Sequence, residues 1–149
     1  QVIEKEGLSY SVIKEDKEIG ITKYSMKSPV ALVTFALADY ERHNDTIKWE
    51  NGKPPIPLEF NSMPGAYLAI KEDFILAELN NSVRYFQSIF GDYPYEKYGA
   101  SFHPFGFGQG FPSMLMIPNT DRSSKYTYSF VSHETAHQWW GNIVAWRSY

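Results

Sequence analysis

The most constraining feature of the sequence is a run near its C-terminal end, His133-Glu134-Thr135-Ala136-His137. On a helix, histidines four residues apart point from the same face, so both imidazoles can bind one metal ion. Neutral imidazole is a good zinc ligand, and Glu134 is placed to take a proton from a water that the metal activates. The run predicts His133 and His137 as metal ligands and Glu134 as the catalytic residue. A surface helix that carries these residues by chance is the alternative.

Two longer runs extend this motif. From His133 the sequence reads HETAHQWWGN, and from Phe90 it reads FGDYPY. They resemble the zinc-helix pattern H-E-x-x-H-Q-W-[FW]-G-N and the turn F-G-x-Y-P-[FY] of the gluzincin aminopeptidases, the family of membrane alanyl aminopeptidase and leukotriene hydrolase. The resemblance reaches back to about Ile21. It implies a zinc metallopeptidase that hydrolyses peptides in the manner of an aminopeptidase, with an α+β fold: the end of an antiparallel β domain (residues 1–45), then the N-terminal half of a thermolysin-like catalytic domain (residues 46–149).

The resemblance also implies that the chain is an excised piece of a longer protein. The third zinc ligand of the family, a glutamate, would fall beyond Tyr149, as would a tyrosine that stabilises the oxyanion. Asp121 and Glu96 can replace that glutamate only if the fold brings them close. Because two imidazoles alone bind zinc weakly, we expect Zn²⁺ to be weakly held or absent and this chain to be inactive. Apolar surface left by the missing half should promote self-association.

A glycine-rich run, residues 106–112, and a predicted strand at residues 113–117 form the second candidate region. Glycine lets another backbone approach closely, and an exposed strand edge can hydrogen-bond an extended peptide. The glycine spacing is not that of a dinucleotide fingerprint. The predicted substrate-binding residues are Gly108, Gln109, Gly110, Phe111 and Ser113.

This run departs from the resembled family, where it reads G-x-M-E-[NY] and its glutamate holds the free α-amino group of the substrate. Aligned through Phe111 and Pro112, that glutamate falls on Gly110, and Gln109 beside it offers only a neutral carbonyl. The departure favours an endopeptidase, or another hydrolase on the same scaffold, as the alternative to an aminopeptidase. A non-catalytic interaction module is the third hypothesis, which the intact H-E-x-x-H disfavours.

Apolar periodicity predicts the remaining elements. A stripe at helical spacing predicts a core-packing helix at residues 71–90, ended by Gly91. The zinc helix should run from about residue 124 to 144, with Ser123 or Ser124 as its N-cap. A nearly continuous apolar run predicts a strand buried on both faces at residues 29–40. Further strands are predicted at residues 8–12, 21–24, 57–60 and 98–102.

Five other residues have specific expectations. We expect Trp139 and Trp140 to pack the zinc helix into the fold and Asn142 to have a structural role. His43 lies in a polar stretch and should face solvent. His103, near the glycine-rich run, is a candidate for the cleft lining, with a place outside it as the alternative.

Composition narrows the class of protein. Hydrophobic residues make up 43% and aromatic residues 17%, enough to form a core. A net charge of −3 and a pI near 5.8 give no reason to expect nucleic acid or an anionic membrane as a partner. Without cysteine there is no disulfide or thiolate metal site. The chain shows no signal segment and no apolar run of the ~20 residues that span a bilayer, so localisation stays open.

Overall fold

The computed structural model describes residues 9–14, 17–22, 28–50, 52–64, 71–118 and 125–144. The described chain is α+β, as predicted, with a two-stranded sheet, a five-stranded sheet and two helices. The small sheet pairs β1 (Ser9–Lys14) with β2 (Lys17–Thr22) in antiparallel register, Ser9 opposite Thr22. These strands overlap the two predicted near the N-terminus.

The five-stranded sheet has the order β3-β4-β5-β7-β6. Strand β3 (Glu41–Ile47) is antiparallel to β4 (Ile56–Ser62). Strands β4, β5 (Tyr98–His103) and β7 (Met114–Pro118) are parallel, and β6 (Gln109–Phe111) closes one edge antiparallel to β7. Parallel neighbours need a long crossover, which the first helix provides between β4 and β5. The domain division near residue 45 stays a prediction.

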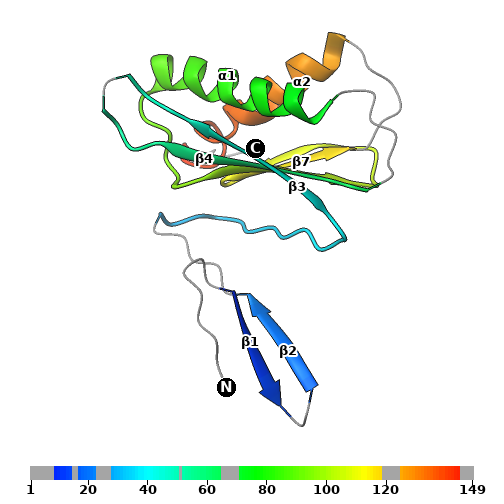
Figure 1. Ribbon diagram of the computed structural model, residues 1–149. Helices are drawn as coiled ribbons and strands as arrows, with labels where there is room; N and C mark the ends of the chain where they lie inside the picture. Colours follow the sequence, from blue (N-terminus) through cyan, green and yellow to red (C-terminus); the bar gives the residue numbers. More distant parts are fainter. Residues whose placement is uncertain are drawn as a thin grey trace.

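Both helices, α1 (Glu72–Phe90) and α2 (Lys125–Ala136), cover the same face of this sheet (Figure 1). The first confirms the predicted helix at residues 71–90. It ends at Gly91, whose φ of 90° suits glycine. Neither described helix combines the length and apolar character that crossing a bilayer requires.

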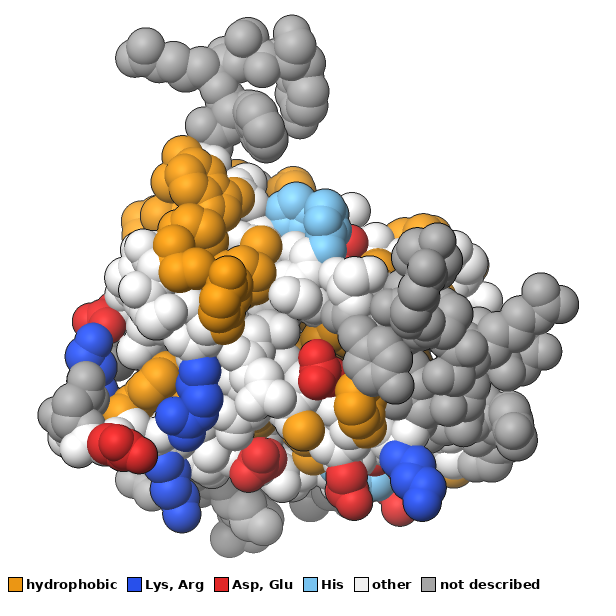
Figure 2. All heavy atoms as spheres, turned by 90° about the horizontal axis from the view of Figure 1, so that it is seen from above, with side chains coloured by type: hydrophobic (Ala, Val, Ile, Leu, Met, Phe, Trp, Pro, Cys, Tyr) orange, Lys and Arg blue, Asp and Glu red, His pale blue; other side chains and the backbone are white. Residues whose placement is uncertain are grey.

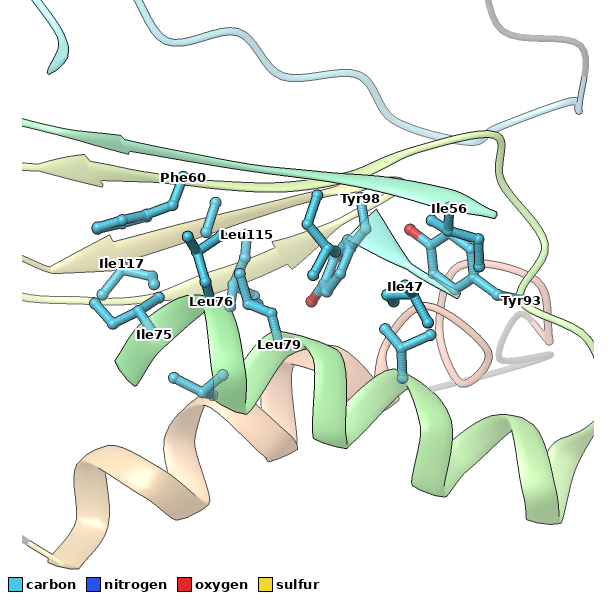
Figure 3. Close-up of a cluster of buried hydrophobic side chains, with 14 of the residues drawn as sticks. Ile47, Ile56, Phe60, Ile75, Leu76, Leu79, Tyr93, Tyr98, Leu115 and Ile117 are labelled. Carbon is cyan, nitrogen blue, oxygen red and sulfur yellow. The ribbon is translucent and has the colours of Figure 1, made fainter. Parts of the chain in front are cut away.

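The core lies between α1 and the sheet. Figure 3 shows side chains from both sides pointing into this layer, with Tyr98 at its centre. Alternate residues of β4 face it, because successive side chains of a strand point to opposite faces. The fully buried large side chains of this layer are Ile47, Leu58, Phe60, Ile75, Leu79, Val83, Tyr98 and Leu115. The layer fixes the sheet edge on which the candidate site depends.

The predicted buried strand at residues 29–40 is wrong. Hydroxyls tie down both ends of this segment: Ser28 donates to the Pro94 carbonyl (3.3 Å) and Tyr40 donates to the Phe102 carbonyl (2.8 Å). Between them the chain is extended and unpaired. An apolar run is buried only where other elements cover both faces, and here Val30 packs against the core while most of the other apolar side chains stay exposed. The exposed ones are Leu32, Val33, Phe35 and Leu37, from 64% to 91% accessible. Self-association through such surface stays a prediction.

Two boundaries near the expected site also differ from prediction. Residues 106–112 are not only a turn, since they contain β6, which forms the edge of the sheet. The strand predicted at residues 113–117 is β7, an inner strand, and Ser113 lies in the turn before it with a φ of 61°.

Helix α2 ends at Ala136 instead of near residue 144. The left-handed φ of 99° at Gly141 is incompatible with a continuing helix. The predicted caps Ser123 and Ser124 lie outside the described residues.

Three single-residue expectations have different outcomes. His43 does not face solvent: it is half-buried, its Nε2 lies 2.9 Å from the Ser62 hydroxyl, and its ring stacks on Phe60. A polar neighbourhood in sequence did not reveal the cross-strand partners that cover it. Trp139 packs into the fold as expected, with 6% of its surface accessible, whereas Trp140 is 48% accessible.

Candidate metal centre

The metal-binding group consists of His133, Glu134 and His137, whose potential ligand atoms all lie within 4.8 Å of one another. It is the one such group found among the described residues. His133 lies in the last turn of α2 and His137 directly after it, with ring centroids 5.0 Å apart. Two atoms that bind one zinc ion are at most about 4 Å apart. The His133 ring is exposed and has room to close the remaining gap.

The surroundings of His137 suit it to bind a metal through one defined atom. Its Nδ1 lies 3.0 Å from the backbone carbonyl of Trp140. Because a carbonyl oxygen only accepts, Nδ1 carries the proton, and the neutral ring has its lone pair on Nε2. A backbone carbonyl that fixes the tautomer in this way is typical behind metal-binding histidines. The residues present therefore fit a zinc ion bound by Nε2 of His137.

Glu134 is a buried carboxylate with a defined orientation. Only 7% of its surface is accessible. Its Oε2 accepts a hydrogen bond of 2.7 Å from the backbone N–H of Gly110 and lies 3.9 Å from Nε2 of His137. A hydrogen bond to an ionised acceptor is stronger than a neutral one and stabilises the carboxylate. The contact occupies one carboxylate oxygen and holds the side chain in one orientation.

A hydrogen bond between Thr135 and Tyr98 joins α2 to strand β5 of the sheet. The Thr135 hydroxyl donates to the Val131 carbonyl (2.7 Å), so the Tyr98 hydroxyl must be the donor in its 2.9 Å contact with Thr135. Burial raises the pKa of Tyr98, and the nearby charge of Glu134 raises it further, while the bond to Thr135 lowers it. Tyr98 therefore stays protonated as a donor. Nothing in the sequence pattern pointed to this pair, since Tyr98 and Thr135 are two ordinary polar residues 37 positions apart.

Gln138 is fully buried directly after the second histidine. Its Oε1 accepts from the Ser113 N–H (2.8 Å), and its Nε2 donates to the Phe111 carbonyl (2.9 Å). Asn142 donates from Nδ2 to the Gly110 carbonyl at 3.4 Å. The structural role predicted for Asn142 corresponds to this hydrogen bond with the backbone of Gly110. The role of Gln138 was missed, although its place one turn after Glu134 was a usable signal.

The predicted substrate-binding residues lie beside the metal-binding group. Gln109, Gly110 and Phe111 form β6, the edge strand. A Cβ atom at Gly110 would lie 2.5 Å from the Glu134 carbonyl oxygen and 3.0 Å from Cβ of His137. Strand and helix approach this closely only because position 110 has no side chain.

Gly108 and Ser113 lie at the two ends of this strand. A Cβ atom at Gly108 would meet the Phe130 ring of α2 at 1.8 Å, so this glycine also permits a close approach. Ser113 occupies the turn and is bound to Gln138. The structure thus brings all five predicted residues to one edge of the sheet, along the side of α2.

The other candidate residues do not join the metal-binding group. His103 is buried, its Nδ1 accepts from the Phe105 N–H (3.2 Å), and its ring contacts Phe105 and Phe107. Glu96 is not a member of the group, and Asp121 lies outside the described residues.

Apolar surface adjoins the metal-binding group. Figure 2 shows histidine side chains at the surface of the helix-bearing face next to a cluster of hydrophobic side chains. The exposed Trp140 follows the motif and meets Phe90 edge to face, with centroids 5.4 Å apart. Ile143 and Val144 are also about half exposed. The histidines are therefore accessible from solvent at an apolar part of the surface.

Neither comparison with models of protein families nor comparison with curated proteins gives a match. Solved structures do match. The chain is similar to an M1 zinc metallopeptidase from Deinococcus radiodurans, with 24% identity and a TM-score of 0.56. It is also similar to a two-domain M1 zinc metallopeptidase variant bound to L-arginine (22%, 0.55) and to a Deinococcus radiodurans variant bound to a Tyr-Ser-Ala substrate (22%, 0.51).

Each of these matches covers 71% of this chain and 23% of the solved structure. The chain therefore spans about a quarter of the length of the proteins it resembles. At this level of identity the similarity establishes the fold alone: the five-stranded sheet and its two helices have the architecture of part of an M1 zinc metallopeptidase.

Proposed function

We propose that this chain carries part of the active site of a zinc metallopeptidase. The observation that carries the proposal is the pairing of a fixed His137 tautomer with a buried, oriented Glu134 beside an exposed His133. A surface helix with a chance motif has no reason to bury the carboxylate or to orient one imidazole. The similarity in fold to M1 zinc metallopeptidases supports the same proposal.

The residues divide the chemistry between them. His133 and His137 would hold zinc, which supplies Lewis acidity to polarise the scissile carbonyl and to acidify water. The Glu134 oxygen that does not bind Gly110 accepts a proton from the attacking water and then donates it to the leaving amine nitrogen. Its burial excludes competing water from the bound oxygen. The Gly110 N–H keeps the carboxylate in place through both transfers.

The edge strand would hold the peptide. Among the described strands β6 pairs with β7 alone, and its middle residue, Gly110, lies next to Glu134 and His137. The Gly110 N–H and C=O on the open side of β6 already bind Glu134 and Asn142, so a peptide lying along this edge would hydrogen-bond through the backbone of the flanking residues of the run. Recognition through the backbone selects extended peptides as a class, without preference for one type of side chain. In this proposal residues 46–149 are the N-terminal half of a thermolysin-like catalytic domain and residues 1–45 belong to a preceding β domain.

The aminopeptidase form of the proposal has a competitor that Gly110 favours. No side chain fits at this position without displacing the backbone of α2, so no carboxylate can hold a substrate ammonium from here. An endopeptidase on the same scaffold needs no such anchor. Hydrolysis of a peptide with a free amine, compared with its N-acetylated form, separates the two: only an endopeptidase cleaves both at similar rates.

Zinc titration tests the proposal directly. We expect the chain to bind one zinc ion, weakly if a third ligand is missing, and His137→Ala to abolish this binding. His43→Ala is the matched control, since it removes a histidine away from the site and should leave zinc affinity unchanged. Glu134→Gln should retain zinc and lose any hydrolysis, which distinguishes a general base from a third ligand. If no zinc binds even to a chain extended beyond Tyr149, the non-catalytic module becomes the better hypothesis.

A further inference from the structure

Three side chains spaced four residues apart connect the metal motif to the β6–β7 hairpin (residues 109–118). Glu134, Gln138 and Asn142 each hydrogen-bond the backbone of this hairpin. Only Glu134 and Gln138 are fully enclosed, with 7% and 0% of their surfaces accessible. The hairpin is therefore held by the segment that also carries the histidines.

The pairing of the hairpin shows which backbone groups these side chains bind. Phe111 and Met114 close a two-residue turn, and Gly110 lies opposite Leu115. In an antiparallel ladder the pairs alternate between hydrogen-bonded and non-hydrogen-bonded, so the N–H and C=O of Gly110 point away from β7. These two outward groups meet Glu134 and Asn142, respectively. The general base is thus bound to the free edge of the sheet.

Gln138 hydrogen-bonds the turn that joins that edge strand to β7. Its amide accepts from Ser113 on one side of the turn and donates to Phe111 on the other, so neither buried polar atom is left unpaired. Ser113 has a φ of 61°, an unfavourable conformation for a residue with a side chain, and the bond to Gln138 stabilises it. The Gln138 side chain therefore binds both residues at the turn that precedes the pairing of Gly110 with Leu115.

We propose that Gln138 is a positioning residue for Glu134. By clamping the hairpin turn it holds the Gly110 N–H on Oε2 of Glu134, which fixes the carboxylate orientation used for proton transfer. This inference rests on the proposed function, because the orientation of Glu134 matters only if Glu134 transfers protons. The hydrogen bonds of Gln138 and Glu134 to the hairpin form without metal or substrate. The hydrogen bonds of the Gln138 side chain go to the hairpin backbone at Ser113 and Phe111, not to the side chains of His133, Glu134 or His137.

Amide hydrogen exchange of the ¹⁵N-labelled, metal-free 149-residue chain tests this inference. In Gln138→Met, which keeps the size of the side chain and removes both hydrogen bonds, the Gly110 and Ser113 amides should exchange about tenfold faster. The Gly110 amide proton should also lose the downfield shift that a carboxylate acceptor causes. In Glu134→Gln, which removes the carboxylate, this downfield shift of the Gly110 amide proton should also disappear, and this identifies its cause. Gln87→Met is the matched control, since Gln87 likewise accepts from a backbone N–H, that of Tyr93, which lies outside the hairpin.

A second variant covers the case in which Gln138→Met does not fold, recognised by loss of protection throughout β4 and β5. Gln138→Glu keeps the acceptor for Ser113 and loses the donor for Phe111, so Ser113 should stay protected while Gly110 exchanges faster. Unchanged exchange and shift of Gly110 in a folded Gln138 variant overturn the inference. An equal effect in Gln87→Met also overturns it. Zinc titration decides the proposed function separately, because the exchange experiment contains no metal.

Discussion

The two helices cover the same face of the sheet and both bury apolar side chains, Val131 and Trp139 among them in α2 and the turn after it, but the second segment buries more polar groups. Helix α1 buries Ile75, Leu79 and Val83 against the sheet. The zinc-motif segment, α2 with the turn after it, buries Glu134, Thr135 and Gln138, each with a hydrogen-bond partner. Apolar burial is non-directional and stabilises, whereas buried polar groups are costly unless satisfied and therefore specify geometry. The first helix holds the fold together, and the second fixes positions at the sheet edge.

The largest expected effect tests the stabilising role of α1. Leu79→Ala should lower the free energy of unfolding by about 2–5 kcal/mol, because the side chain is fully buried and its removal leaves a cavity. Urea denaturation measures the loss. Ile89→Ala on the same helix is the control: this side chain is 53% accessible and should change stability by less than about 0.5 kcal/mol. Similar losses for both variants would contradict the assignment of α1 to the core.

The close approach of α2 to the sheet edge should give the next largest effect. Gly110→Ala places a methyl group against the Glu134 backbone and should cost about 1–3 kcal/mol by overpacking, with displacement of β6 from the helix. The shift is measurable as changed amide resonances in β6. Gly106→Ala, where an added methyl group meets nothing within 4 Å, should be nearly neutral. If both substitutions are tolerated equally, β6 and α2 are not in contact.

Thr135→Val tests the polar contacts beneath α2. It leaves the buried Tyr98 hydroxyl without an acceptor and should cost about 1–3 kcal/mol. Tyr98→Phe should cost less, about 0.5–1.5 kcal/mol, since Thr135 keeps its bond to Val131. The double variant should lose less than the sum of the single losses. Additive losses in the double-mutant cycle would show that the two hydroxyls do not interact.

The smallest effect is a dependence on alkaline pH. Burial raises the pKa of Tyr98 and Tyr93 in the folded chain above the ordinary value near 10. Each therefore contributes stability that is fully present below pH 10. This stability falls as pH rises, because the unfolded chain loses the proton first. We expect a loss of about 0.4 kcal/mol per tyrosine by pH 10. Tyr98→Phe should flatten this fall; an identical slope would mean that Tyr98 titrates normally.

Local patterns in the sequence predicted most of the elements that periodicity alone can specify. The stripe of α1, the alternation of β4 and the run of β5 each placed an element within a few residues of its observed bounds. The apolar run at residues 29–40 failed because periodicity reports how a segment can be buried, not whether a partner is present. The end of α2 was placed too late because the apolar spacing continues past Ala136 although Gly141 turns the chain.

The sequence by itself determined the chemistry of the candidate site, since His133, Glu134 and His137 meet through local spacing on one helix end. Tertiary structure decided everything that gives those side chains their orientation. The Gly110 N–H on Glu134 and the Gln138 clamp on the hairpin join residues about 25 positions apart. The stacking of Phe60 on His43 likewise crosses two strands. Such contacts depend on which strand becomes the sheet edge and how closely a helix can approach it, and these follow only from packing the whole chain.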